Sequence, residues 1–380
     1  MDCDVLIVGG GVAGLSLAWR LSPSRSVVLV EAEGSLAYHT SSRSARQMQP
    51  SYGPEAIQEL TRRSIAMVEG ISERLPAPIL VPRAMLTLGT ETEVAALVAA
   101  NANLEMLTHS ETMERSPDLR PETFEASALD GTAMEVDVPA LLEFYRRQAI
   151  GTGAMVLTGA PVTAVEVVAP EPAGGTDTED AATEGQPTRF HVTAGRHSIT
   201  AGTLVDAAGA WADVVAAQFG ARPRGLQPHR RSVAIVSTEH PVDPTGPMVE
   251  PADESFYYRP DGSHLLISPC ESVPAEPGDA QVVDEDIAEL IHRIGEVTTV
   301  GITGVERSWT GLRTQPADGL PVVGFDADVP NLFWLAGQGG YGIQTSAALA
   351  TLAAGLLTGT LTDDDGWLAG ALSPQRTGLG

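Results

Sequence analysis

Apolar residues at the start of the chain follow two spacings, one typical of buried strands and the other of a helix. Residues 5–8 and 27–30 are short runs of mostly β-branched side chains, as expected for strands that are covered on both faces. Between them, the apolar residues of 15–21 recur on one helical face. The pattern predicts a strand, a helix and a second strand, the unit from which parallel α/β sheets are built.

The same two spacings predict the other elements of the chain. Alternation within 254–260 places Ser255, Tyr257 and Arg259 on one face of a strand. The predicted helices are 55–75, 92–103, 139–151, 284–294 and 343–357, with a loop and a short helix over 104–120. The predicted strands are 84–88, 154–158, 161–168, 190–194, 197–201, one that starts at 203, 229–236, 254–260, 262–268 and 332–336.

One stretch has no periodic apolar face. Residues 169–188 are rich in proline, glycine, threonine and acidic residues, which predicts a flexible hairpin insert remote from function. No internal repeat is evident elsewhere. The mixture of helices and strands over 380 residues predicts an α/β fold that is large enough for two domains.

Three glycines after the first strand have the spacing of a dinucleotide-binding turn. In G-x-G-x-x-G, Gly9 allows a sharp turn, Gly11 lets the backbone approach a pyrophosphate, and Gly14 lets the helix pack on the strand. The helix N-terminus would present its N–H groups to the phosphates. Glu31 ends the second strand, where a carboxylate can accept the ribose hydroxyl hydrogens. An acidic residue there favours FAD or NAD over NADP.

Three further segments have the composition of cofactor-lining loops. Residues 38–47 are polar and rich in small side chains, and residues 203–213 run from an apolar strand through small residues into a helix. Residues 337–342 open the last predicted helix, and we expect Gly339, Gly340 and Gly342 to leave N–H groups free. The dipole at that helix start would stabilise negative charge on a reduced flavin. The sequence therefore predicts an extended cofactor site built from separated segments.

The composition excludes several classes of function. The formal net charge is −26, and all 23 basic residues are arginine, so nucleic acid and anionic membranes are poor partners and lysine chemistry is excluded. Cys3 and Cys270 are the two cysteines, too few for a disulfide framework or a cysteine-based zinc site. No stretch has the length of a membrane span, and the first strand leaves no room for a signal peptide. We expect a cytoplasmic protein without a metal.

Seven motifs along the chain resemble the FAD-dependent D-amino acid oxidase (DAO) superfamily, in particular bacterial D-amino acid dehydrogenases of the D-arginine dehydrogenase type. They are GGGVAG with Glu31, HTSSRSA, LVDAAGAW, LQPHRRS, DESFY, WTGLRTQPADGLPVVG and GQGGYGIQTSAA. The resemblance implies a Rossmann-type FAD-binding domain of the GR2/DAO type with an inserted mixed β-sheet substrate-binding domain. The FAD-binding domain would comprise 1–50, 135–220 and 306–380, and the substrate-binding domain 51–134 and 221–305.

The resemblance also implies how FAD is held. We expect non-covalent FAD, because Cys3 is misplaced for a flavin link and Ser44 stands where some tethered relatives carry histidine. The residues expected to contact the cofactor are Gly9, Gly11, Gly14, Glu31, Ser42, Arg43, Ser44, Ala45, Val162, Ala208, Gly209, Trp211, Gly339, Gly340, Tyr341, Gly342, Ile343 and Gln344.

By the same resemblance, the reaction is hydride transfer from the Cα of a D-amino acid to flavin N5, giving an imino acid that hydrolyses to a 2-oxo acid. A neutral amine needs no acid–base residue. Arg313 would clamp the substrate carboxylate, Tyr257 would donate to it, Arg231 would line the pocket wall and Tyr52 its entrance. Strand arginines are more often surface charges, so burial would support these roles. Electrons would pass to a quinone, another carrier or O2.

Two questions about the substrate stay open at the sequence level. Relatives that prefer cationic substrates have an acidic residue where this chain has Met85, which favours a neutral or unusual side chain, since a buried cation without a partner is costly. The alternative is oxidation of secondary, N-substituted or cyclic amino acids, as in glycine or sarcosine oxidases, which would also suit a biosynthetic pathway. The absence of lysine leans towards a dehydrogenase. A more remote alternative is a non-catalytic FAD-binding protein.

Overall fold

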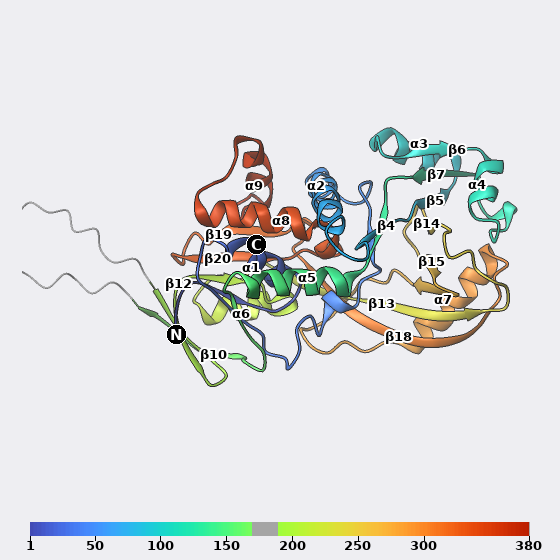
Figure 1. The fold of residues 1–380 in the computed structure, drawn as a ribbon. Helices are drawn as coiled ribbons and strands as arrows, with labels where there is room; N and C mark the ends of the chain where they lie inside the picture. Colours follow the sequence, from blue (N-terminus) through green and yellow to red (C-terminus); the bar gives the residue numbers. More distant parts are fainter. Residues whose placement is uncertain (169–188, 380) are drawn as a thin grey trace, which may run out of the picture.

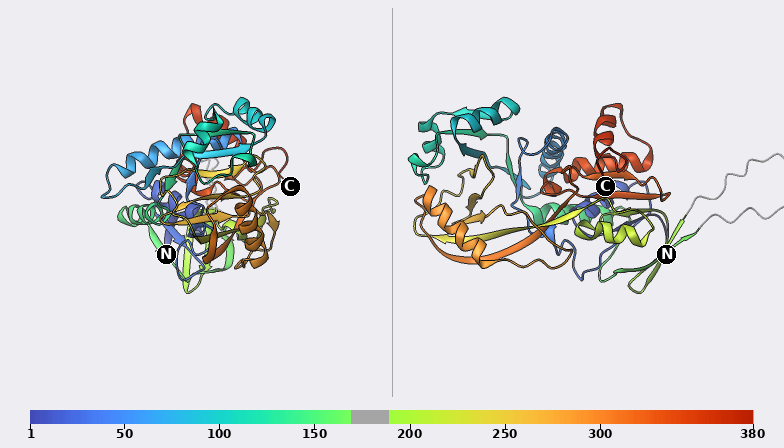
Figure 2. Two further views of the ribbon diagram at one scale, coloured as in Figure 1. Left: turned by 90° about the vertical axis from the view of Figure 1, so that its right-hand side faces the viewer. Right: turned by 180° about the vertical axis from the view of Figure 1, so that it is seen from behind.

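The computed structural model describes residues 1–168 and 189–379. Two large β-sheets lie at opposite ends of an elongated molecule, and a small three-stranded sheet completes the set among these residues (Figure 1). The view from behind shows the same division, with the chain crossing repeatedly between the two ends (Figure 2, right). The predicted insert 169–188 lies outside the described residues. The predicted α/β class is confirmed.

The first sheet has eight strands, with β12 (His197–Asp206) in its middle. Its second half runs parallel to β1 (Asp2–Val8) on one side and to β20 (Leu332–Ala336) on the other, whereas its first half is antiparallel to β11 (Arg189–Ala194). We had expected two strands over 197–206, but one continuous strand serves both pairings. The other strands are β2 (Val27–Val30), β9 (Met155–Leu157), β10 (Val162–Val168) and β19 (Val322–Phe325).

Four helices pack together beside this sheet, because each has an apolar face. Helix α1 (Val12–Leu21) packs against both α5 (Val138–Gly151) and α8 (Gly342–Thr358), and α8 also packs against α2 (Glu55–Ser72). Their buried side chains form one large core with β1 and β2. The parallel strands β1, β2 and β12 are buried on both faces, as the continuous apolar runs predicted.

The second sheet has nine strands and forms the other end of the molecule (Figure 1). Its longest pair is β13 (Gln227–Thr238) with β18 (Ile302–Gln315), antiparallel from Gln227 opposite Gln315 to Thr238 opposite Ile302. The remaining strands are β5 (Met85–Gly89), β6 (Glu105–Leu107), β7 (Ala126–Asp130), β14 (Met248–Pro251), β15 (Tyr257–Asp261), β16 (His264–Ser268) and β17 (Val273–Pro274). Residues 306–315, which we assigned to the FAD-binding segments, thus pair within this sheet. The domain boundaries stay a prediction.

The two faces of the second sheet pack differently. Phe256 and Tyr258 point into the core beneath helix α7 (Asp284–Val297), while Tyr257 points to the opposite face and packs with Met85 and Val233. This alternation is the one that the sequence predicted. The other helices are α3 (Glu91–Ala100), α4 (His109–Arg115), α6 (Ala212–Gln218) and α9 (Gly366–Leu372), with short 3-10 turns at Thr40–Ser42, Pro121–Thr123, Gly209–Trp211 and Asp363–Asp365.

A buried ion cluster joins the second sheet to the small sheet of β3 (Gln47–Met48), β8 (Met134–Val136) and β4 (Leu80–Pro82). Glu135 on β8 pairs with Arg83 at 2.6 Å and with the fully buried Arg259 at 3.0 Å. Arg259 also donates its Nε–H to the carbonyl of Ala45 at 3.0 Å. Burial lowers the pKa of Arg259 to about 10. Arg259, although it shares the face of Tyr257, therefore has a structural role.

No single helix within residues 1–168 and 189–379 is long and apolar enough to cross a membrane. One bent pair, Gly342–Thr358 with Asp363–Leu372, meets the length and composition criteria together, with a 115° break between its parts. Across the same residues, no group of three or more histidine, cysteine or acidic side chains is arranged to hold a metal ion.

Candidate active site

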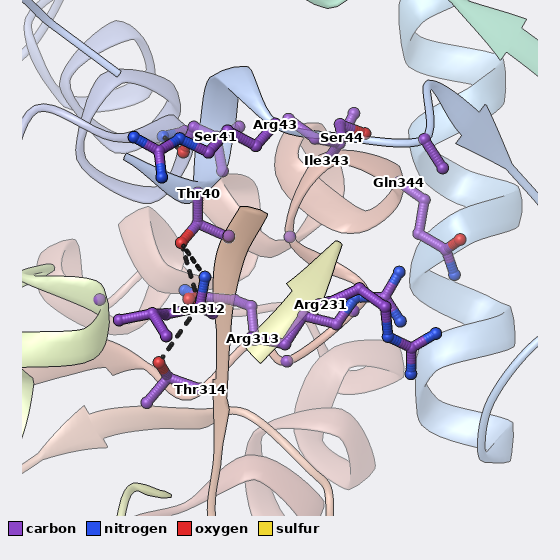
Figure 3. A pocket seen from close by; sticks show the side chains of 18 of the residues that line it. Thr40, Ser41, Arg43, Ser44, Arg231, Leu312, Arg313, Thr314, Ile343 and Gln344 are labelled. Atoms are coloured by element: carbon purple, nitrogen blue, oxygen red, sulfur yellow. Dashed lines mark hydrogen bonds between the residues drawn. The ribbon is translucent and has the colours of Figure 1, made fainter. Parts of the chain in front are cut away.

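One continuous cleft runs between the glycine-rich turn of the first sheet and the inner face of the second (Figure 3). It encloses about 1300 Å³, open solvent at its mouth included. All four predicted substrate residues line it, together with Gly11, Arg43, Ser44, Ala45, Gly209, Gly339, Gly340, Gly342, Ile343 and Gln344 of the predicted cofactor residues. Segments that are far apart in the sequence therefore meet in one place.

The first glycines form a tight crossing that no side chain fits. Gly9 has φ +113°, and a Cβ there would lie 2.3 Å from the carbonyl oxygen of Ala207 at the end of β12. A Cβ on Gly14 would lie 2.0 Å from the Gly9 carbonyl oxygen. These contacts let α1 begin directly against the ends of β1 and β12. The turn therefore brings the α1 N-terminus to the cleft, as a dinucleotide pyrophosphate requires.

Glu31 and the 38–47 loop complete this end of the cleft. The Glu31 carboxylate accepts hydrogen bonds from the N–H of Gly10 at 2.7 Å and of Glu33 at 2.9 Å, which fixes it beside the glycine turn. Ser41 Oγ accepts from the N–H of Val12, the first residue of α1, at 2.9 Å. A carboxylate retains further acceptor positions, so Glu31 can still bind ribose hydroxyls.

The start of α8 closes the cleft on another side, with one difference from our expectation. Gly339 does not leave its N–H free, because it donates to the carbonyl of Thr314 at 2.9 Å. Tyr341 likewise donates to the carbonyl of Gln338 at 2.8 Å. Gly340 and Gly342 make no such bond among the described residues and line the cleft. The helix-start dipole therefore remains available through these two glycines.

Two arginines on the floor of the cleft lack an ion-pair partner within the described residues. Arg231 on β13 is opposite Gly311, and Arg313 on β18 is opposite His229, so both side chains project from the same face of the β13–β18 ribbon. In Figure 3 they extend towards the same side of the cleft. Neither makes a hydrogen bond or ion pair with a described residue, whereas the adjacent Arg230 pairs with Asp286 at 2.7 Å. Enclosed charges without partners indicate a site for an anion.

Tyr257, on strand β15 of the same sheet, also has a buried polar group without a partner in the part of the chain that the structure describes. Its side chain is 3 % exposed, and its hydroxyl has no hydrogen-bond partner among the described residues. Burial raises its pKa, while nearby Arg313, the Ser268 hydroxyl and Arg231 partly offset that effect. The Ser268 hydroxyl donates its own hydrogen to the Ser232 carbonyl at 2.7 Å. Burial also opposes protonation of Arg313, yet the neighbouring Tyr52 and Tyr257 raise its pKa above its usual value. A neutral donor and a cation thus face the same space.

Tyr52 lies between the two sides of the cleft. Its ring contacts that of Tyr341 with centroids 5.2 Å apart, and burial raises its pKa. Its electrostatic neighbours include Arg313 and Arg231 as well as two acidic residues. This position is compatible with the predicted place at the entrance.

Eight of the predicted cofactor residues do not line the cleft themselves. Gly9, Gly14 and Glu31 shape the turn behind it, and Tyr341 packs on Tyr52. Ser42 donates to the backbone of residue 39, Val162 lies at a bulge of β10, Ala208 donates its N–H to Asp206, and Trp211 packs against His39.

Glu250 is a cleft residue that sequence reasoning missed. Val249 is opposite Tyr258, so the antiparallel register puts Glu250 opposite Tyr257 and on its face. Burial, reinforced by nearby Glu254, raises the pKa of Glu250 to about 8, although Arg313 and Arg231 oppose the rise. The available signal was a glutamate at an inward position of the apolar strand Met248–Pro251.

This residue corrects our reasoning about the side-chain pocket. We expected a pocket without a carboxyl group because Met85 occupies the place where cation-preferring relatives carry an acid. Met85 is fully buried and does not line the cleft, while the neighbouring strand β14 supplies Glu250 to it. The cleft therefore contains a carboxyl group that the sequence had not placed there, and the side-chain preference stays a prediction.

Comparisons with known proteins agree with this architecture. The family model described as "FAD dependent oxidoreductase" (DAO) matches residues 4–356. The glycine oxidase of Geobacillus kaustophilus (strain HTA426) is 25 % identical over 375 residues, 93 % of this chain and 92 % of the relative. A crystal structure of glycine oxidase from Geobacillus kaustophilus has a TM-score of 0.79 at 23 % identity and 99 % coverage of both chains. That of L-proline dehydrogenase from P. horikoshii has a TM-score of 0.78 at 17 % identity and 95 % coverage of both.

These matches confirm the superfamily but not the D-arginine dehydrogenase type, since the relatives reported above are a glycine oxidase and a proline dehydrogenase. The family match extends over nearly the whole chain, including the glycine turn and the start of α8. An FAD site of this kind requires the tight turn at Gly9 and Gly14 and a cleft that continues from this turn to the second sheet. The chain belongs to the DAO family of FAD-dependent oxidoreductases.

Proposed function

We propose that this enzyme oxidises the Cα–N bond of an amino acid whose carboxylate is bound by Arg313 and Tyr257. The observation that carries the proposal is the unpartnered set of Arg231, Arg313 and the Tyr257 hydroxyl in the same cleft as the dinucleotide turn. Planar guanidinium groups bind carboxylates through two parallel hydrogen bonds. A carboxylate there would supply partners to groups that otherwise have none.

The residues around the cleft fit FAD as the second occupant. Gly9, Gly11 and Gly14 would admit the pyrophosphate, Glu31 the ribose, and the start of α8 the flavin end. When bound, FAD supplies the two-electron acceptor that protein side chains lack. Arg313 and Tyr257 would orient the substrate by its carboxylate, leaving the Cα–N bond to be presented to the cofactor.

We further propose that the FAD is not covalently attached. No cysteine or histidine is among the residues that line the cleft within the described part of the chain. Cys3 is buried in the core of the first sheet. Burial raises the pKa of the Cys270 thiol to about 12, which leaves it unreactive as a thiolate at neutral pH.

For the substrate, secondary, N-substituted or cyclic amino acids are the first candidates and D-amino acids the second. The similarity to glycine oxidase and to L-proline dehydrogenase supports this order. The absence of lysine from the chain favours transfer of electrons to a carrier over direct reaction with O2. The carboxylate clamp would serve either class of amine equally well.

The test is anaerobic reduction of the bound flavin, followed by absorbance. The FAD-loaded protein is mixed in turn with glycine, sarcosine, proline and pipecolate, and with the D- and L-forms of common amino acids. Bleaching by secondary or cyclic amines supports the first candidate, and bleaching by primary D-amino acids alone supports the second. Stable yellow colour with all of them would contradict the proposal and favour a non-catalytic FAD-binding protein.

A further inference from the structure

Glu250 lines the cleft and makes no hydrogen bond or ion pair with any described residue. It stands on β14, opposite Tyr257 and on the same face of the sheet. Glu135 shows how a structural carboxylate behaves in this fold, because it is held by two arginines. Nothing comparable holds Glu250, so its carboxyl group is not explained by stabilisation of the fold.

The charges around the cleft are separated into two ends. Arg313 and Arg231 project from β18 and β13, the ribbon at one side of the sheet. Glu250 lies three strands away from β13 in the order β13-β16-β15-β14. Asp253 and Glu254, in the turn that joins β14 to β15, are its electrostatic neighbours. In strand order the two arginines thus lie on one side of Tyr257 and Glu250 on the other, although Arg313 and Arg231 still lower the pKa of Glu250 across the cleft.

The unpartnered hydroxyl of Tyr257 lies between these two ends. If the carboxylate of a ligand binds Arg313 and Tyr257, the rest of the ligand would extend across the sheet face towards Glu250. Complementarity then requires a positive or hydrogen-donating group at that far end of the ligand. An apolar end would leave the carboxyl group enclosed without a partner.

We propose that Glu250 determines the side-chain preference of this enzyme by binding a basic nitrogen of the substrate. This inference rests on the proposed function and names the substrate class within it. The substrate is an amino acid that carries a second, basic nitrogen a few bonds from Cα. The carboxylate clamp holds one end, and Glu250 holds the other.

Binding of such a group changes the protonation of Glu250. In the empty cleft, burial together with Glu254 and Asp253 raises its pKa to about 8, while Arg313 and Arg231 lower it. Tyr52 and Tyr257 also face this space. Most of the protein therefore carries a neutral Glu250 at neutral pH. A bound cation favours the ionised form, so a proton is released on binding.

Paired ligands of equal length test the proposal. Ornithine and norvaline differ in a terminal ammonium group and both have an oxidisable Cα–N bond. 5-Aminopentanoate and pentanoate differ in the same way but have no amine on Cα. The first pair is followed by anaerobic flavin reduction, with both enantiomers. The second pair is followed by calorimetric titration of FAD-loaded protein in two buffers of different ionisation enthalpy, which counts released protons.

We expect ornithine and 5-aminopentanoate to be preferred over their neutral partners by about tenfold or more, equivalent to about 1.4 kcal/mol. Glu250→Gln should remove that preference and the proton release, leaving norvaline within about threefold of its original value. Glu105→Gln is the matched control, because it removes the same charge from an exposed strand residue of the same sheet that does not line the cleft. It should change either preference by less than about threefold.

The outcomes separate the two proposals. Reduction of the flavin by norvaline as readily as by ornithine, or an unchanged preference in Glu250→Gln, overturns the role of Glu250 and leaves the proposed function standing. If no amino acid reduces the flavin, the proposed function fails. In that case the titrations still decide: tighter 5-aminopentanoate binding with proton release supports Glu250 as the cation site, and equal binding of the two acids overturns it.

Discussion

Tyr257→Phe should weaken carboxylate binding without weakening the fold. The hydroxyl of Tyr257 is buried and has no partner in the described protein, so its removal costs the folded state no hydrogen bond. An unsatisfied buried polar group is unfavourable by about 1–3 kcal/mol. We therefore expect the free energy of unfolding of the substrate-free variant to stay the same or to rise.

The effect on binding has the opposite sign. A hydrogen bond to a charged group contributes about 1.5–3 kcal/mol, which corresponds to a loss of about 10- to 150-fold in affinity for a substrate carboxylate. Titration of the FAD-loaded protein with a carboxylate ligand, followed by the flavin spectrum, measures this loss. Denaturant unfolding of the same samples measures stability.

Tyr258→Phe is the matched control. Tyr258 is the next residue and equally buried, but it points to the other face and donates to Asp118 Oδ2 at 3.0 Å. Its substitution should lower stability by about 1.5–3 kcal/mol and leave carboxylate affinity unchanged. The reasoning is refuted if Tyr257→Phe unfolds more easily than the parent and binds carboxylates as tightly.

Three other substitutions test the cofactor turn, a buried acid and the ion cluster. Gly9→Ala places a Cβ 2.3 Å from a backbone oxygen at a residue with φ +113°, so this variant should be purified without FAD and without its yellow colour. Gly34→Ala is the control and should keep the colour, because a Cβ there meets no atom within 4 Å. Asp206 has a pKa well above 3.8 because it is fully buried. The folded protein favours the neutral form of Asp206, so its contribution to stability is lost as pH rises above 3.8. The melting temperature of Asp206→Asn should therefore fall less with rising pH than that of the parent protein. Equal slopes for the two proteins would contradict this. Glu135→Ala leaves two buried arginines unpaired and should cost about 3–5 kcal/mol in denaturant unfolding; a cost below about 1 kcal/mol would show that solvent already screens the cluster.

The sequence predicted best those features of the fold that are determined by residues close together in the chain. Residues 5–8 and 27–30 were predictable as strands because both faces are buried. The tight turn was predictable because the contacts of Gly9 and Gly14 exclude any side chain. The alternation that puts Tyr257 opposite to Tyr258 follows from the pleat alone. These features depend on neighbours along the chain or on one obligatory contact.

Other features depend on contacts between distant segments. Strand β7 was not predicted, because it is identified by its pairing with β5 and β6 and not by a pattern in its own sequence. Glu250 reaches the cleft through the pairing of β14 with both β5 and β15, which no local spacing reveals. Gly339 donates to Thr314 across the cleft, so the expectation of a free N–H could not be checked from the sequence.

The reciprocal hydrogen bonds between Thr40 and Leu312 have a thermodynamic consequence. Thr40 Oγ1 donates to the Leu312 carbonyl at 2.9 Å and accepts from the Leu312 N–H at 3.1 Å. Next to Thr40, Ser41 holds the start of α1, and next to Leu312 stands Arg313. The loop beside the proposed cofactor site and the strand that carries Arg313, the proposed carboxylate ligand, are thus held together by hydrogen bonds. If FAD stabilises this shared arrangement, it strengthens substrate binding, and the substrate then strengthens FAD binding by the same factor.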